Sequence, residues 1–237
     1  MSYIYIKRNN KMNCSCENCH IQAIFFKSIN SDELDEFCGA RVEKIIPAGT
    51  TFIKQGDKIR SFKYLKEGLI KLHRVDDAGN KQIISFGTPM DFVSIHNIFA
   101  EETYSYSVTA LETSTVCIFN IDIIKRLIKT NGEFAENLIS TKSRASNRIL
   151  SNSLDLISKS MYGKVASVIL FFHEKIYFTM GFDLPISRKE IAEYTGLSIE
   201  TVIRVISEFR RDGLIKVYGK RIEIIDKDGL MSIYEHS

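Results

Sequence analysis

The stretch Ile186–Asp226, "ISRKEIAEYTGLSIETVIRVISEFRRDGLIKVYGKRIEIID", holds the spacing that decides how this chain folds. Ala192 is followed after four positions by Gly196, and Val202 comes six positions later. Two helices that cross steeply need a small side chain where they touch, and the tight turn between them needs a backbone that tolerates positive φ. Ala192 and Gly196 meet these needs. The spacing therefore predicts a DNA-binding helix–turn–helix, with an ordinary helical hairpin as the alternative.

The second helix of this pair carries the side chains that predict base reading. Glu200 and Arg204 are four positions apart, so they share one face of the helix. In the major groove, Arg can donate two hydrogen bonds to guanine, and Glu can accept one from cytosine. The alternative is a surface ion pair that contributes almost nothing to stability. Base reading is favoured because the N-terminal part of a recognition helix meets the base edges. The predicted contacts from this helix are Ser198, Ile199, Glu200, Thr201, Ile203 and Arg204.

The residues after the second helix predict a wing. Two short apolar runs flank Tyr218-Gly219-Lys220, which indicates a hairpin. From Arg188 to Arg221 there are eight basic and five acidic residues, so this segment carries a local charge of +3. Arg188, Lys189 and Lys220 are candidates for phosphate contacts, which set the register of a protein on DNA, although each can equally be a solvated surface charge.

The first two thirds of the chain show two further patterns. Between Arg41 and about Asn120, short apolar runs such as residues 62–75 and 81–87 alternate around turn residues, which predicts hairpins within a sandwich or barrel. From Glu133 to about Ser158 a long helix is expected, without Gly or Pro and with a narrow apolar stripe. Such a stripe is typical of a dimer seam, and a helix packed on its own domain is the alternative. The fold class is therefore α+β.

Composition excludes several other classes of protein. The 237 residues are 44% hydrophobic and 26% charged, which is typical of a soluble globular protein with one large domain or two ordinary ones. The chain has no apolar run long enough to span a membrane and no recognisable signal peptide, so a cytoplasmic protein without membrane contact is expected. In that reducing compartment, the five cysteines are not expected to form disulfides. The five histidines are scattered and no catalytic constellation stands out, so an enzyme is not expected.

Three segments of the chain resemble the Crp/Fnr family of bacterial transcription regulators: "PAGTTFIKQGD" (47–57), "YLKEGLIKL" (64–72) and residues 186–215. The resemblance covers nearly the whole chain. It implies an N-terminal cupin-like β-roll that resembles a cyclic nucleotide-binding domain, a long dimerisation helix and a C-terminal winged helix–turn–helix. It also implies a homodimer on a two-fold-related operator in double-stranded DNA, with RNA polymerase as a further partner. The corresponding boundaries are 1–20 for a cysteine-containing arm, 21–130 for the sensor, 131–158 for the helix and 159–237 for the DNA-binding domain.

Two features favour the Fnr branch of that family over its cyclic-AMP receptors. In the receptors, a Glu and an Arg-Ser pair grip the nucleotide; here Ile95 stands for the Glu and Tyr104-Ser105 for the pair. A cyclic phosphate buried without an Arg would be an unpaired charge, so cyclic AMP is not expected to bind. By contrast, "ALETSTVC" (110–117) resembles the segment of the Fnr branch that carries its distant cysteine. Glu200 and Arg204 also match the recognition helix of that branch, which implies a TTGA-like half-site, whereas Ile203 replaces a Ser.

The N-terminal stretch "NCSCENCH" (13–20) allows three interpretations. Following the resemblance, Cys14, Cys16, Cys19 and Cys117 would supply the four thiolates of a [4Fe–4S] cluster that senses oxygen or redox state. The C-x-C-x₂-C spacing departs from the Fnr pattern, however. Zinc bound by the three arm cysteines with His20 or Cys117 is a second interpretation, and simple thiols are the third.

A rival hypothesis for the signal places a small organic effector in the β-roll and leaves the cysteines idle. Its predicted pocket consists of Ile95, His96, Tyr104 and Ser105. With either signal, we expect the sensor to shift the dimer between two states, one of which sets the two recognition helices about 34 Å apart, one turn of DNA.

Overall fold

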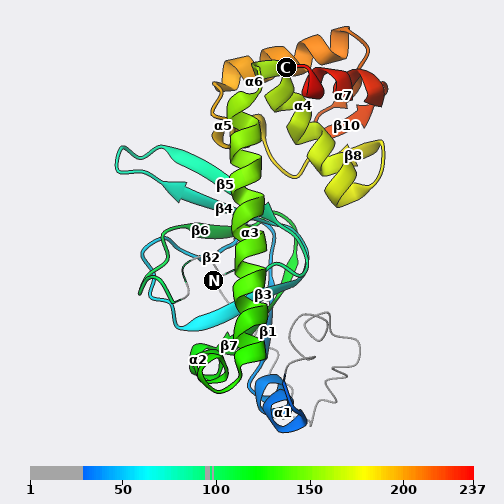
Figure 1. Ribbon diagram of the computed structural model, residues 1–237. Coiled ribbons are helices and arrows are strands. Elements are labelled where there is room, and N and C mark those ends of the chain that lie inside the picture. The colour runs from blue at the N-terminus through cyan, green and yellow to red at the C-terminus, as the bar shows by residue number, and fades with distance from the viewer. Residues whose placement is uncertain (1–28, 94–96, 98) are drawn as a thin grey trace. The chain divides into compact units, whose positions relative to one another are not determined.

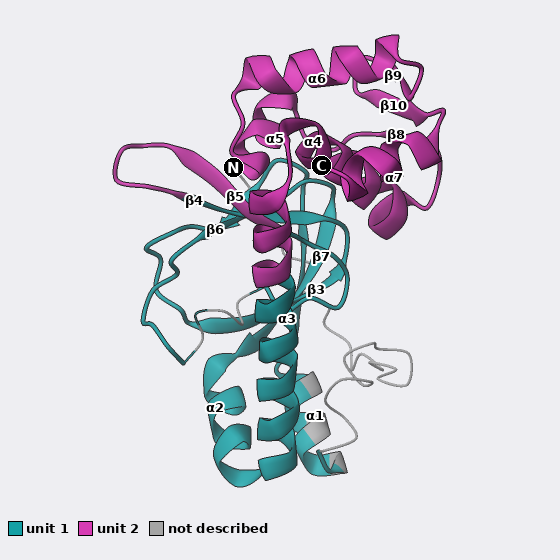
Figure 2. Cartoon of the chain, turned by 45° about the horizontal axis from the view of Figure 1, so that its top comes forward, with its two compact units in different colours: residues 1–74, 86–148 teal, residues 75–85, 149–237 magenta. Residues whose placement is uncertain are grey.

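The computed structural model describes residues 29–93, 97 and 99–237. The chain divides into two compact units, one formed by residues 1–74 and 86–148 and the other by residues 75–85 and 149–237 (Figure 2). Helix α1 (Ser31–Gly39) opens the described part of the first unit. Asn30 caps it, because its Oδ1 accepts from the Glu33 N–H at 2.9 Å and Glu33 Oε2 accepts from the Asn30 N–H at 3.1 Å.

Seven strands form the two antiparallel sheets of a β-roll (Figure 1). One sheet has the order β1-β7-β3 and contains β1 (Val42–Ile46), β7 (Ser114–Asn120) and β3 (Ser61–Glu67). The other has the order β2-β6-β4-β5 and contains β2 (Thr51–Ile53), β6 (Ser107–Ala110), β4 (Ile70–Val75) and β5 (Lys81–Gly87). The hairpin predicted between β4 and β5 is confirmed: Asp76 Oδ1 accepts from the N–H groups of Ala78 at 3.0 Å and Asn80 at 2.8 Å.

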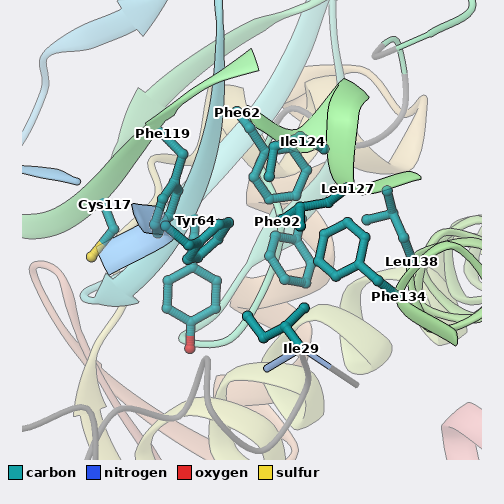
Figure 3. Close-up of a cluster of buried hydrophobic side chains, with 11 residues drawn as sticks. Ile29, Phe62, Tyr64, Phe92, Cys117, Phe119, Ile124, Leu127, Phe134 and Leu138 are labelled. Carbon is teal, nitrogen blue, oxygen red and sulfur yellow. The ribbon is translucent and has the colours of Figure 1, made fainter. Parts of the chain in front are cut away.

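The core of the first unit lies where the sheet β1-β7-β3 meets the helices (Figure 3). Phe37 of α1 stacks on Phe119 of β7 with ring centroids 4.3 Å apart. Helices α2 (Ile121–Thr130) and α3 (Gly132–Ser158) close the same side. The side chains that meet there are Ile29, Phe37, Phe62, Tyr64, Phe92, Cys117, Phe119, Ile124, Leu127, Phe134 and Leu138.

Helix α3 is the long helix that the sequence predicts, and its 27 residues begin within one position of the expected start. Asn131 ends α2, and its Oδ1 accepts from the Phe134 N–H at 3.1 Å, which starts α3 directly. Three large apolar side chains in the second half of α3 are exposed: Leu150 is 57%, Leu154 58% and Ile157 76% exposed. Their spacing of four and then three residues places them on one stripe of the helix.

The second unit is built around helix α4 (Met161–Phe171), which continues into a π-helical turn, η3 (Phe172–Tyr177). Helix α5 (Arg188–Thr195) and helix α6 (Ile199–Arg211) follow a short strand, β8 (Gly181–Asp183). The predicted wing is confirmed as β9 (Ile215–Tyr218) and β10 (Arg221–Ile224). Two elements were not anticipated: β8, which makes the wing a three-stranded sheet of order β8-β10-β9, and the C-terminal helix α7 (Lys227–Glu235).

These elements confirm the α+β class, with a β-roll, a long helix and a winged helix–turn–helix in that order. The boundaries predicted from sequence at residues 20, 130 and 158 stay predictions. Within the part of the chain that the structure describes, no helix has both the length and the apolar character needed to cross a membrane.

Candidate functional site

The turn between α5 and α6 has the geometry that the sequence predicts. Ser187 and Glu190 start α5 with a capping box, in which Ser187 Oγ accepts from the Glu190 N–H at 3.2 Å and Glu190 Oε2 accepts from the Ser187 N–H at 2.7 Å. Gly196 ends α5 at φ 72°, and its N–H donates to the Ala192 carbonyl at 2.9 Å. A left-handed residue at this position terminates the helix and redirects the chain, and glycine adopts that conformation without strain.

Ser198 caps helix α6, and the helix divides into a buried and an exposed face. Ser198 Oγ accepts from the Thr201 N–H at 3.1 Å. The buried face consists of Val202, Val205, Ile206 and Phe209. Because an α-helix has about 3.6 residues per turn, burying these four directs Ile199, Glu200, Ile203, Arg204 and Ser207 outward. Every base-reading candidate from the sequence is therefore on the exposed side of α6 or at its edge.

Glu200 and Arg204 do not form the ion pair that was the alternative explanation for their spacing. Among the salt bridges between described residues, none joins them. Instead, Arg204 Nη2 lies 3.2 Å from the sulfur of Met161, at the start of α4. One turn further along α6, Glu208 accepts from the Tyr162 hydroxyl at 2.7 Å, and this bond raises the pKa of Tyr162. A thioether is a weak acceptor, so Arg204 can exchange this contact for a stronger one at small cost.

The three phosphate-contact candidates differ in exposure. Lys189 and Lys220 are exposed, whereas Arg188 is partly buried, and this burial lowers the pKa of its guanidinium. Lys220 lies in the wing turn, where its carbonyl accepts from the N–H of Leu184, the residue after β8, at 2.9 Å. Lys189 and Lys220 are therefore better placed than Arg188 for a diffuse contact with phosphate.

Sequence reasoning missed the contribution of α4 to this site. Met161 and Tyr162 contact the outward-facing Arg204 and the neighbouring Glu208, which fixes where these side chains rest on α6. The available signal was Ser160, which caps α4 by accepting from the Gly163 N–H at 3.3 Å. A predicted helix start does not reveal which distant helix it will touch, so this contact needed the structure.

Cys117 is the one member of the predicted ligand set that lies among the described residues. It is 0% exposed on the central strand β7, opposite Glu43 of β1 and Tyr64 of β3. Its thiol donates weakly to Glu43 Oε1 at 3.9 Å. Arg41 and Lys66 contact the same carboxylate oxygen at 2.9 and 3.3 Å, so two cations offset the charge beside the sulfur.

The other ligand candidates, Cys14, Cys16, Cys19 and His20, lie outside the described residues. Among those that are described, no three His, Cys, Asp or Glu side chains gather as a metal site. Of the predicted ligands the structure therefore describes Cys117 alone, and the whole ligand set stays a prediction from the sequence.

The predicted effector pocket is described only in part, since Ile95 and His96 lie outside the described residues. Tyr104 is buried, and its hydroxyl accepts from Lys63 Nζ at 3.2 Å. Burial lowers the pKa of Lys63 to about 8. Ser105 is exposed, and its Oγ accepts from Asn97 Nδ2 at 2.9 Å.

An open groove of about 1040 Å³ exists elsewhere in the first unit, beside α2 and α3. It is lined by basic and apolar side chains that include Lys58, Arg60, Lys125, Ile128 and Leu138. Tyr104 and Ser105 do not line it. Tyr104 and Ser105 are therefore separate from this groove, and the effector pocket stays a prediction.

Comparison with known families and proteins agrees with this arrangement. Residues 43–131 match the model of a cyclic nucleotide-binding domain, and residues 163–233 match that of a Crp-like helix-turn-helix domain. The chain is 30% identical over 206 residues to the transcriptional activator protein anr of Pseudomonas aeruginosa, covering 85% of this chain and 83% of the relative. It is 27% identical over 234 residues to the transcriptional activator protein FnrA of Stutzerimonas stutzeri, covering 96% of each. It is 29% identical over 227 residues to the anaerobic regulatory protein of Haemophilus influenzae, covering 92% of this chain and 87% of the relative.

Solved structures show the same fold. FixK2 from Bradyrhizobium japonicum superposes with a TM-score of 0.71 at 18% identity, over 81% of this chain and 96% of that one. A transcriptional regulator of the Crp/Fnr family from Eubacterium rectale superposes with a TM-score of 0.75 at 20% identity, over 87% of this chain and 95% of that one. The matched domains, the relatives and the exposed recognition helix together establish that this chain belongs to the Crp/Fnr family of DNA-binding transcription regulators.

Proposed function

We propose that this chain is a homodimeric regulator that reads a two-fold-related operator with Glu200 and Arg204 and responds to oxygen or redox state through its cysteines. One observation carries the DNA-reading part. Glu200 and Arg204 project from the N-terminal half of the capped helix α6, on the face opposite its buried residues, and they are not paired with each other. In the major groove, Arg204 would donate two hydrogen bonds to guanine, and Glu200 would accept one from cytosine.

Phosphate contacts would set the position of α6 in the groove. Lys189 lies in the first turn of α5, and Lys220 lies at the tip of the wing. Ser198 and Thr201 stand at the start of α6, where hydroxyl and backbone N–H groups commonly meet phosphate. These contacts supply affinity without sequence preference, whereas Glu200 and Arg204 supply the preference.

The stripe on α3 supports the proposed dimer. Leu150, Leu154 and Ile157 are exposed in the single chain, and apolar side chains with this spacing are usually covered by a partner helix. A second copy related by two-fold symmetry would cover the same stripe on both protomers. It would also present two copies of α6 to two half-sites of one operator. RNA polymerase, implied by the resemblance, stays a predicted further partner.

The proposed input rests on the position of Cys117. The neighbouring side chain on the same face of β7 is Phe119, and Phe37 of α1 stacks on it. Helix α1 therefore packs on the face of the sheet β1-β7-β3 to which Cys117 and Phe119 belong, and in the sequence it follows the segment that carries Cys14, Cys16 and Cys19. The names of the anaerobic relative and of the FnrA relative support the same input.

The residues that would hold a [4Fe–4S] cluster are Cys14, Cys16, Cys19 and Cys117. Such a cluster supplies a redox-active centre when it is bound. Cys117 would contribute a ligand from the central strand β7, where its thiol faces Glu43, and Arg41 and Lys66 contact that carboxylate. A change at Cys117 would therefore be transmitted to Phe119, Ile124 and the start of α3 through direct packing in one core.

Anaerobic purification tests this input. We expect a coloured protein with about four irons and four sulfides per chain, and loss of both in Cys117→Ser. Cys38→Ser is the matched control, since Cys38 lies outside the predicted ligand set, and we expect it to keep the iron. Finding one zinc ion and no iron per chain would instead support the zinc interpretation of these cysteines. A metal-free protein that still binds its operator selectively would refute both metal interpretations and favour the effector-gated regulator.

A further inference from the structure

Helix α6 exposes two isoleucines beside its proposed base-reading pair. Ile199 is 37% and Ile203 50% exposed, although the buried face of the helix is already complete without them. Successive residues of an α-helix are rotated by about 100°, so Ile203 lies about 60° around the helix from Glu200 and one turn after Ile199. The outward surface around Glu200 and Arg204 is therefore edged by branched apolar groups.

Single exposed apolar residues are normal on protein surfaces and need no explanation by themselves. Ile225, which follows the wing and is 46% exposed, is such a case. Ile203 differs because it lies beside Glu200, on the side away from Arg204, in the helix that faces DNA in this proposal. Its β-branched side chain is also stiff about χ1, so little conformational freedom is lost when it makes a contact. An apolar group at this point can read a feature of DNA that Glu and Arg cannot.

We infer that Ile203 is a specificity-determining residue that packs against the C5-methyl group of a thymine next to the base pairs read by Glu200 and Arg204. This inference rests on the proposed DNA-reading role of α6. Thymine is the base that presents a methyl group in the major groove, and side chains with apolar groups recognise it by contact. Ile203 thereby excludes cytosine, which places a bare ring carbon and a polar amino group at the same edge. Ile199 lies one turn earlier and extends the same apolar edge towards the start of α6.

Replacing thymine by uracil in the operator tests this directly, because the exchange removes the methyl group and keeps every base-pairing hydrogen bond. Full-length protein would first select its operator from a random duplex library. Each thymine of the selected half-site would then be replaced by uracil in both half-sites, and affinity measured by fluorescence anisotropy. Burying one methyl group is worth about 0.8 kcal/mol, so we expect about fourfold weaker binding per half-site at the contacted thymine and about 15-fold for the two together.

Variants of Ile203 separate a direct contact from an effect of uracil on DNA shape. In Ile203→Ala the penalty for uracil at that thymine should disappear, whereas in Ile203→Val most of it should remain. Both side chains suit an exposed helix position, and equal melting temperatures would verify folding. Ile225→Ala is the matched control, and it should keep the full penalty. If wild-type protein binds the uracil operator equally well at every position, or if Ile203→Ala keeps the penalty, this inference is wrong while the proposed base reading stands. If selection yields no preferred sequence at all, both are wrong.

Discussion

Replacing Leu154 and Ile157 by serine should convert the proposed dimer into monomers. These side chains are 58% and 76% exposed in the single chain, and both lie on the apolar stripe of α3. Burying a Leu or Ile completely is worth about 1.5–3 kcal/mol, so covering the exposed part of each is worth about 1–2 kcal/mol. Two-fold symmetry doubles the number of side chains involved. The double variant should therefore weaken dimerisation by about 4–8 kcal/mol, which corresponds to a Kd at least about a thousandfold higher.

Sedimentation velocity across a dilution series of the full chain measures this change. We expect the wild type to sediment as a dimer and Leu154→Ser/Ile157→Ser as a monomer at the same micromolar concentration. The melting temperature of the monomer should be close to that of the dissociated wild type, because exposed side chains contribute little to the fold of a single chain. Ile45→Ser is the matched control, since Ile45 is 55% exposed but belongs to strand β1 and not to the α3 stripe. A double variant that stays dimeric at every concentration would refute the assignment of this stripe to the dimer seam.

Three further predictions concern stability. Gly196→Val should lower the free energy of unfolding by about 1–2 kcal/mol in a urea titration, because a branched residue is strained at φ 72°. Gly196→Asn should recover most of that loss. Equal stability of the wild type and both variants would contradict this prediction. Phe134→Ala should lower the free energy of unfolding by about 3–5 kcal/mol in the same assay, since the Phe134 ring is 0% exposed in the core of the first unit. A decrease below about 1 kcal/mol would mean that the core does not enclose this ring. Burial holds the pKa of Lys63 at about 8 in the folded chain against 10.5 ordinarily, so the unfolded chain binds more protons between these values and the stability of the wild type should rise from pH 8 to pH 10. Lys63→Met should abolish that rise, and a rise of equal size in the variant would assign it to other groups.

The parts of the fold that could be predicted have local signals. Gly196, Ser198 and the turn at Asp76 act within four or five residues, so their roles are readable along the chain. Strand β8 could not be predicted in this way. It has three residues, and it becomes a strand by pairing Phe182 with Ile222, which lies 40 positions later. Helix α7 was hidden by Gly229, because a glycine lowers helix propensity, although Asp226 caps the helix.

The same distinction applies to the candidate site. The outward face of α6 follows from the spacing of its buried residues, so Glu200 and Arg204 could be named from the sequence. Arg204 rests against Met161, which lies 43 positions earlier in the chain. This contact depends on how α4 packs, so it could not be predicted from the sequence. The surroundings of Cys117 are another non-local feature, since Glu43 lies 74 positions away and meets it through strand pairing.

Direct readout by α6 is the central claim, and the ratio of operator affinity to random-duplex affinity tests it most directly. The ratio would be measured by anisotropy at one fixed salt concentration for the wild type, Glu200→Ala, Arg204→Ala and Arg211→Ala. Arg211 is the matched control, an exposed arginine in the last turn of the same helix, beyond reach of the base edges. We expect Glu200→Ala and Arg204→Ala each to lower the ratio by about 10–100-fold, since a good base contact is worth about 1–3 kcal/mol, and Arg211→Ala to weaken both affinities equally. An unchanged ratio in Glu200→Ala and Arg204→Ala would contradict the account.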